Sequence, residues 1–250
     1  ATGDYIFCLD SDDKLLPECI SHLVEKAELT NADITLCDYT SGGNAQNRGG
    51  KLTASVKHIT TNAECIHAFA KSWFNVAPWC KLLRRNFIES NQLYFKENII
   101  NEDAPWTFQL CLNAQRMTFV NEELYYYRDN PNSIMSFSKN QKIVDSNIVA
   151  LQIFQDEIQK RPQLWNLFDI YIIYMRQVII LYTLLVDFYS FRKISQTIDL
   201  LHKHTWLSPF FNVCAPNIPK YYRTWNIALK LPRFFQPFYI WFIVKLQQHQ

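Results

Sequence analysis

The chain reads Asp4-Tyr5-Ile6-Phe7-Cys8-Leu9-Asp10-Ser11-Asp12-Asp13 near its start, an apolar run that ends in three carboxylates. Apolar, β-branched and aromatic residues in this order predict a buried strand. Carboxylates packed this closely repel one another unless a cation lies among them. Ligands bind at strand ends in open α/β sheets, and oxygen ligands suit Mg²⁺ or Mn²⁺. We therefore expect a divalent-metal site at the mouth of a sheet.

The same acids have a second interpretation. Asp10, Ser11 and Asp13 are also typical of a solvated turn that caps a helix, since Pro17 suits the first turn of a helix. These residues taken alone leave both interpretations open.

The residues on either side of the acids carry a family resemblance. Residues 1–6 and 13–18 closely resemble the segment A-x-G-x-Y-I-x-F-L-D-S-D-D-x-x-x-P of family 2 glycosyltransferases. The resemblance implies that Asp12 is the direct metal ligand and that Asp10 reaches the ribose of the donor or the water shell of the metal. It implies a supporting role for Asp13.

Residues 73–85 form a second stretch that resembles this family. They are similar to its W-x-K-L-y-R-r segment, which implies that Trp79 and Lys81 shape the cleft for the acceptor substrate. A core aromatic residue beside a surface cation is the alternative that the pattern leaves open.

A second acidic cluster, Asn101-Glu102-Asp103, precedes a helical pattern with Pro105 near its start. Asp103 is suited to capping this helix. The stretch also resembles the family motif G-x-x-x-E-D-x-x-F, which implies that Asp103 is the catalytic base, with Glu102 as the alternate.

Residues 125–134 resemble the family stretch l-Y-x-Y-R-x-x-x-x-S-i, which closes the catalytic domain. Arg128 in this stretch is expected to meet phosphate or acceptor, or else to pair with a surface carboxylate. The local pattern does not separate the two.

Together these matches imply a partial GT-A, Rossmann-like α/β domain over residues 1–137, holding the metal and acceptor side of the catalytic site. The expected reaction moves a sugar, with inversion, from a nucleotide-sugar donor to a hydroxyl of a glycan or lipid-linked saccharide. A UDP-sugar is the donor we expect, with Mg²⁺ or Mn²⁺ as cofactor. Because the family's nucleotide-binding strands precede the matched segments, we expect this chain to be an N-terminally truncated fragment.

Residues 138–250 are predicted to form a mainly helical C-terminal region. A helix is expected from residue 139 to about residue 161. Residues 165–191 are more apolar, but three charged residues interrupt them, which favours a buried or interfacial helix over a spanning one.

The charge of the chain is uneven. Its net charge is +2, whereas residues 201–250 contain six cations, no acid and many aromatic residues. This composition suits an anionic membrane surface, and nothing upstream indicates a nucleic-acid module. We expect a cytoplasmic protein peripheral to the inner membrane that extends a lipopolysaccharide-type or capsular glycan.

Two other functions compete with sugar transfer. A phosphatase of the aspartyl-phosphate type favours Thr or Val at the position that Lys14 occupies here, which argues against that class. The other alternative is an inactive truncated remnant that serves as a membrane-associated binding or scaffold protein.

Periodicity also predicts local structure along the first half of the chain. It predicts helices over residues 17–29 and 62–70, the second capped by Asn62, and a strand over residues 33–39. Residues 117–120 and 124–128 read as a short hairpin.

Overall fold

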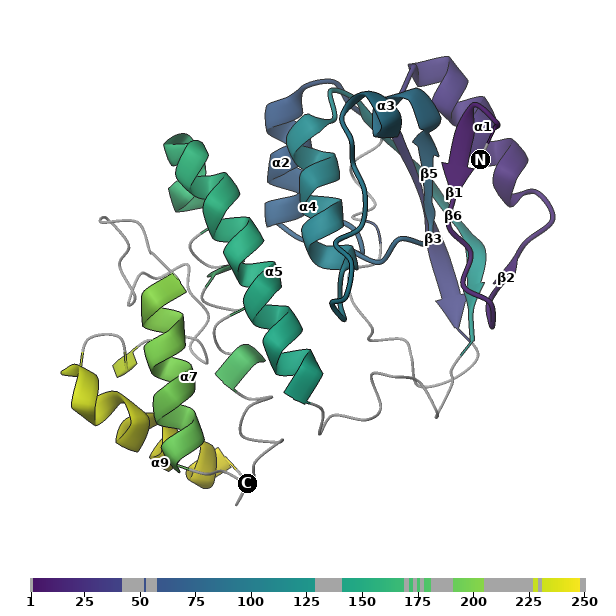
Figure 1. The fold of residues 1–250 in the computed structure, drawn as a ribbon. Coiled ribbons are helices and arrows are strands. Elements are labelled where there is room, and N and C mark those ends of the chain that lie inside the picture. Colours follow the sequence, from purple (N-terminus) through teal and green to yellow (C-terminus); the bar gives the residue numbers. More distant parts are fainter. Residues whose placement is uncertain are drawn as a thin grey trace. The chain divides into compact units, whose positions relative to one another are not determined.

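The computed structural model describes residues 2–41, 52, 58–128, 141–168, 171–172, 175, 178–180, 191–204, 227–228 and 231–247 (Figure 1). It consists of two compact units, residues 1–96 with 103–133 and residues 97–102 with 134–250. The boundary predicted between residues 137 and 138 lies outside the described residues. Most of the predicted helix over residues 165–191 lies outside them as well.

The first unit contains strands and helices that are short and alternate along the chain. They are β1 (Tyr5–Phe7), β2 (Lys14–Leu15), α1 (Cys19–Thr30), β3 (Ile34–Ser41), β4 (His58–Ile59), α2 (Asn62–Ala70), β5 (Lys81–Arg84), α3 (Arg85–Ser90), α4 (Asp103–Asn113) and β6 (Met117–Tyr127).

The strands form one mixed sheet in the order β1-β5-β3-β6-β2, with β4 also paired to β6. β3 and β6 run parallel, and the other pairs are antiparallel. Figure 1 shows α1 on one side of the sheet and α2 and α4 on the other. The predicted α/β class is therefore confirmed for this unit.

The first strand is shorter and less buried than predicted. β1 contains only Tyr5–Phe7, all half-buried, and Leu9 is 50% exposed. Within the described part of the chain β1 pairs on one side, with β5, so it lies at an edge of the sheet rather than in its middle.

The predicted helix after the acids is confirmed as α1. Its inward positions Cys19, Leu23 and Ala27 are spaced by four residues and are buried against the sheet. The helix ends at Thr30 and is capped by Asn31, whose N–H donates to the Ala27 and Glu28 carbonyls. The left-handed backbone of Asn31 (φ 48°) lets the following Ala32 N–H donate to the Ala27 carbonyl at 3.1 Å.

The predicted helix over residues 62–70 is confirmed as α2, but its predicted cap is wrong. Thr61 caps the helix through a hydrogen bond from the Glu64 N–H to its hydroxyl. Asn62 instead donates to carbonyls near the end of α4, and the shortest of these bonds, to Ala114, is 2.7 Å. These bonds satisfy carbonyls that the end of a helix leaves without partners.

The predicted hairpin over residues 117–128 is wrong. The structure has one strand, β6, parallel to β3, and the pairing register shifts on both sides of Asp38. Residues 121–123 are polar and exposed at this irregularity. The break in the apolar pattern thus marks a bulge within a strand rather than a turn.

From residue 141 onward the described part of the second unit is mainly helical, as predicted. Its elements are α5 (Gln141–Lys160), η3 (Pro162–Leu164), α7 (Phe191–His204), η4 (Arg233–Phe235) and α9 (Gln236–Gln247). α5 confirms the predicted amphipathic helix, with Ile143, Leu151 and Phe154 among its buried residues. Among the described helices, none has the length and hydropathy needed to cross a membrane.

Candidate active site

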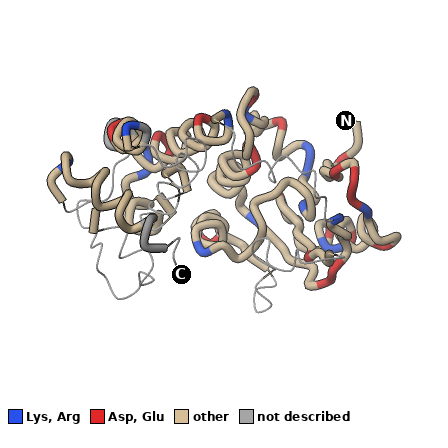
Figure 2. Tube along the Cα trace, turned by 90° about the horizontal axis from the view of Figure 1, so that it is seen from below, with Lys and Arg blue, Asp and Glu red and all other residues tan. Residues whose placement is uncertain are grey.

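The acidic residues after β1 form a tight turn at one end of the sheet. The Asp13 N–H donates to the Asp10 carbonyl at 3.1 Å, which closes the turn before β2 begins. Asp10 is exposed, whereas Asp12 and Asp13 are half-buried. Figure 2 shows red acidic positions in the part of the trace near the N-terminus.

Asp13 fastens this turn to the end of β6. One of its carboxylate oxygens accepts the Tyr125 hydroxyl at 2.5 Å, and the other accepts the backbone N–H of Arg128 at 2.8 Å. The Asp10 N–H donates to the Tyr125 hydroxyl oxygen at 3.3 Å. Both Asp13 oxygens are therefore engaged by β6 and the residue that follows it, which suits a positioning role.

Tyr125 is the residue that holds the turn, and the sequence pattern assigned it no role. Its side chain is fully buried. Burial, and then the hydrogen bond to Asp13, raise the pKa of Tyr125 well above its ordinary value. The phenol therefore stays protonated and remains a hydrogen-bond donor to the carboxylate.

Tyr125→Phe should loosen the acidic turn while keeping the ring in place. The substitution leaves one Asp13 oxygen without its phenol donor, so we expect the free energy of unfolding to fall by about 1–2 kcal/mol. Urea unfolding measures this loss. Tyr126→Phe, at a half-buried neighbour, is the control and should change stability by much less. Equal losses in the two variants would contradict the role given to Tyr125.

Trp79 lies in an aromatic cluster next to the acidic turn. Its ring stacks on Tyr125 with centroids 5.1 Å apart and meets Tyr39 edge-on at 4.9 Å. Tyr127 is the third aromatic neighbour, at 5.5 Å. Trp79 is only 7% exposed and belongs to the core of the first unit. The structure thus brings Trp79 and the acids together through Tyr125, while contact between Trp79 and an acceptor stays a prediction.

Lys81 is buried, so the alternative that placed it on the surface is wrong. Its side chain is 1% exposed and donates to the Asn75 carbonyl at 2.6 Å and to the Ala77 carbonyl. The Phe74 ring lies 5.7 Å from the ammonium. Lys81 therefore ties the loop before β5 to the core, and it shapes that loop from within.

Burial lowers the pKa of Lys81 from 10.5 to about 8, although the nearby Cys80, Cys111 and Asp103 act in the opposite direction. Between these pH values the unfolded chain holds a proton that the folded protein has lost. Stability therefore rises with pH across this window.

The difference in unfolding free energy between the wild type and Lys81→Met isolates this titration. We expect the difference to move in favour of the wild type by about 2 kcal/mol between pH 7.5 and pH 9.5. Chemical denaturation at both pH values provides the measurement. Lys96→Met, at an exposed lysine, should show no such change. If the difference in unfolding free energy between the wild type and Lys81→Met does not change across this pH range, the lowered pKa of a buried Lys81 is contradicted.

Asp103 begins α4, and its carboxylate accepts the Ala104 N–H at 2.8 Å. This contact is typical of an acidic residue in a first turn. The helix is anchored by Thr107, which donates to the Val76 carbonyl at 2.6 Å, in the loop that Lys81 also holds. Asp103 belongs to the first unit, and Glu102 is grouped with the second. The role of either as base stays a prediction.

Arg128 is the last described residue of the first unit, and its side chain is exposed. Its backbone bond to Asp13 places it beside the acidic turn. This placement is compatible with a contact to phosphate, which stays a prediction.

The donor set of the turn fits a hard divalent cation that also binds phosphate. Among the described residues, no three His, Cys, Asp or Glu side chains are grouped to hold a metal ion. Mg²⁺ is, however, commonly bound by one or two carboxylates together with substrate phosphates. Both Asp13 oxygens accept hydrogen bonds, from Tyr125 and from the Arg128 N–H. That Asp10 and Asp12 hold a cation stays a prediction.

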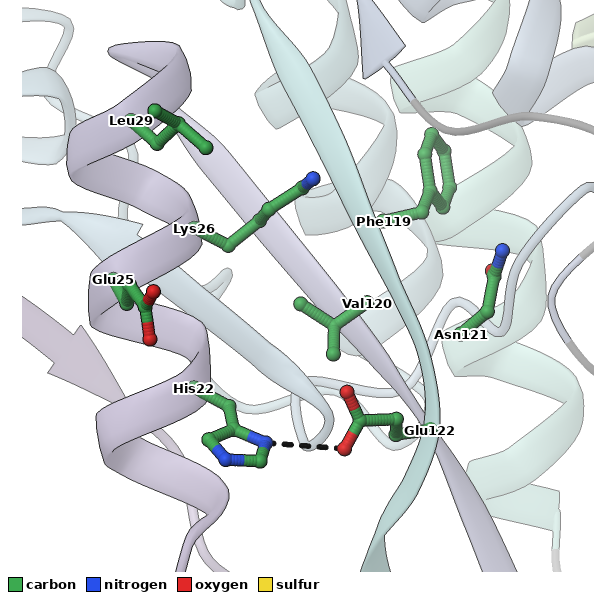
Figure 3. A pocket seen from close by; sticks show the side chains of 8 residues that line it. All are labelled: His22, Glu25, Lys26, Leu29, Phe119, Val120, Asn121 and Glu122. Atoms are coloured by element: carbon green, nitrogen blue, oxygen red, sulfur yellow. Dashed lines mark hydrogen bonds and ion pairs between the residues drawn. The ribbon is translucent and has the colours of Figure 1, made fainter.

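A separate surface pocket of about 440 Å³ lies between α1 and β6 (Figure 3). His22 Nδ1 lies at hydrogen-bond distance, 3.0 Å, from a Glu122 carboxylate oxygen across it, with both side chains about half exposed. Exposed pairs of this kind contribute little to stability. None of the predicted site residues lines the pocket.

Comparison with known proteins identifies the first part of the chain. Residues 1–91 match the model of the family described as glycosyl transferase family 2. The first part of the chain is thus similar to family 2 glycosyltransferases. The family resemblance inferred from the sequence is thus confirmed. The matched segment contains the acidic turn, Trp79 and Lys81, whereas Asp103 and Arg128 lie beyond it.

Curated proteins that match the chain are similar to it over part of their length. The uncharacterized glycosyltransferase EpsJ of Bacillus subtilis is 29% identical over 141 residues, which are 54% of this chain and 40% of EpsJ. Cholesterol galactosyltransferase of Borreliella burgdorferi is 25% identical over 176 residues, 66% of this chain and 48% of that protein. The chain therefore spans less than half the length of these two relatives.

Among solved structures, S. aureus TarS 1–349 in complex with UDP-GlcNAc is similar to this chain, with a TM-score of 0.48 and 16% sequence identity. The similarity covers 88% of this chain and 75% of the TarS chain.

Proposed function

We propose that the chain is the metal- and acceptor-binding part of an inverting glycosyltransferase. It would act on a nucleotide-sugar donor, a UDP-sugar in our proposal, and a hydroxyl of a glycan or lipid-linked saccharide. The observation that carries the proposal is the acidic turn within the family 2 segment, fastened by Asp13 and Tyr125 beside Trp79 and Arg128.

On the donor side, Asp12 and Asp10 would hold Mg²⁺ or Mn²⁺ together with the diphosphate. When bound, the cation stabilises the negative charge that builds on the leaving diphosphate. Asp13 and Tyr125 keep the turn in place, and the exposed Arg128 lies beside it for a phosphate oxygen. Rigid support of this kind limits the reorganisation needed when the donor binds.

On the acceptor side, a hydroxyl must lose its proton as it attacks the anomeric carbon. Asp103, at the first turn of α4, would take that proton, with Glu102 as the alternate. The new bond forms between the acceptor oxygen and the sugar while the bond from the sugar to the diphosphate breaks. The site therefore needs no second carboxylic acid to protonate the leaving group, unlike a glycosidase.

We place the protein on the cytoplasmic face of the inner membrane, held there by residues 201–250. The six cations and the absence of any acid in that stretch support attraction to anionic lipids. A lipid-linked acceptor for a lipopolysaccharide-type or capsular glycan would then be within reach. The relative named for cholesterol galactosylation is consistent with a lipid acceptor.

Donor screening tests the proposed reaction. The full natural protein is incubated with Mn²⁺, a panel of nucleotide-diphosphate sugars, and bacterial lipid and glycan extracts. Release of the nucleoside diphosphate is then measured. We expect release with one sugar donor, and more of it in the presence of extract. No release from any donor would contradict the proposal.

A further inference from the structure

Among the described residues of the second unit, five phenylalanines on neighbouring elements are exposed, called here the phenylalanine face. Their exposed fractions range from 42% to 71%, and they are Phe191, Phe234, Phe235, Phe238 and Phe242. Single exposed apolar residues are common on soluble proteins. A contiguous group of large ones marks an interaction surface.

The face draws on three neighbouring elements, because α9 packs against both α7 and η4. The rings of Phe234 and Phe235 lie 4.3 Å apart, and those of Phe191 and Phe238 lie 5.0 Å apart. Phe238 and Phe242 are one helical turn apart on α9, so they lie on the same side of that helix.

α9 is apolar on its buried side as well as on its exposed side. Ile240 is 4% exposed, and the helix packs against α7. A helix at a water surface normally carries polar residues opposite its buried side, whereas α9 carries Phe238 and Phe242 there. With twelve residues it is too short to span a bilayer.

The charge of the sequence around the phenylalanine face indicates which kind of partner the face binds. Residues 201–250 contain six cations and no acid, and the exposed Arg233, next to the face, pairs with Asp199. A second copy of the chain would bring the same positive charge, whereas an anionic lipid surface brings the opposite one. Exposed aromatic rings in a stretch of sequence rich in cations are typical of helices that lie in a membrane interface.

We infer that the phenylalanine face inserts into the interface of an anionic bilayer, with α9 lying along the surface. The inference rests on the proposed peripheral location and names the residues that achieve it. The cations of residues 201–250 attract the headgroups, and the rings supply the apolar contact.

Vesicle flotation of the full chain tests this inference. Vesicles of phosphatidylglycerol and phosphatidylcholine should carry the wild-type protein upward at low salt, and vesicles of phosphatidylcholine alone should carry much less. Phe235→Ser/Phe238→Ser/Phe242→Ser should weaken binding by ~100-fold, since each lost ring removes apolar contact with the bilayer. Phe234→Ser/Phe242→Ser leaves the Phe191–Phe238 contact intact and should weaken it by about tenfold.

The matched control is Leu29→Ser/Tyr94→Ser, which removes two exposed apolar side chains of the first unit and should leave flotation unchanged. Circular dichroism confirms that each variant is folded. Absence of wild-type binding, or equal binding by folded phenylalanine variants, would overturn the inference. So would light scattering that shows a dimer which the triple variant abolishes, because the face would then bind a second copy.

Binding of Mn²⁺ with a nucleoside diphosphate, measured on the same proteins, separates this inference from the proposed reaction. Loss of flotation in a variant that still binds Mn²⁺ supports the phenylalanine face. If the wild-type protein floats with the vesicles but binds no Mn²⁺, the result supports membrane binding by the phenylalanine face and contradicts only the proposed reaction.

Discussion

Asp12→Asn should reduce sugar transfer by roughly 10³-fold or more, because it removes a carboxylate placed to balance the charge that develops on the leaving diphosphate. The turn itself should persist, since Asp13 and Tyr125 hold it without Asp12. Initial rates at saturating donor and several Mn²⁺ concentrations measure the effect. The loss should be in kcat, and added Mn²⁺ should restore little of it.

Asp4→Asn is the matched control for Asp12. Asp4 is an exposed aspartate just before β1, at the opposite end of this strand from the acidic turn. Its backbone carbonyl accepts the Arg85 N–H, and the substitution leaves this hydrogen bond in place. This variant should retain transfer. Near-normal turnover by Asp12→Asn would remove the acidic turn from the proposed mechanism.

Asp103→Asn should lower kcat by ~10²–10⁴-fold with little change in the KM for donor, because an amide cannot accept the proton of the acceptor hydroxyl. The amide oxygen can still accept the Ala104 N–H, so α4 should keep its first turn. Steady-state rates with donor and acceptor varied in turn provide the measurement.

Glu102→Gln and Asp156→Asn accompany that variant. Asp156 is an exposed residue of α5, so its variant should behave as the wild type. Glu102→Gln should have the smaller effect of the two site variants. A larger loss in Glu102→Gln than in Asp103→Asn would transfer the role of base to Glu102.

The sequence predicted the elements whose signal is local. α1, α2 and α5 follow the spacing of their apolar residues, and β3 follows its alternation. The hairpin prediction failed because a bulge and a turn both interrupt alternation with polar residues. Only the pairing of β6 with β3 separates these two cases.

The hydrogen bonds that hold the candidate site in place could not be predicted from the sequence, because they join distant parts of the chain. Tyr125 and Asp13 are 112 positions apart, and no local pattern links them. Lys81 looks like a surface cation until packing places carbonyls around its ammonium. The acids stand out in the sequence because three carboxylates after an apolar strand are costly without a ligand, and their role as a cation site stays a prediction.

Manganese binding is the most direct test of the acidic turn as a cation and nucleotide site. The full natural protein is added to Mn²⁺ together with each nucleoside diphosphate in turn. Electron paramagnetic resonance measures the Mn²⁺ that stays free. We predict one Mn²⁺ bound per chain with one of these nucleotides, and weaker binding in Asp12→Asn but not in Asp4→Asn. Equal binding by wild type and Asp12→Asn, or no binding with any nucleotide, would contradict the assignment.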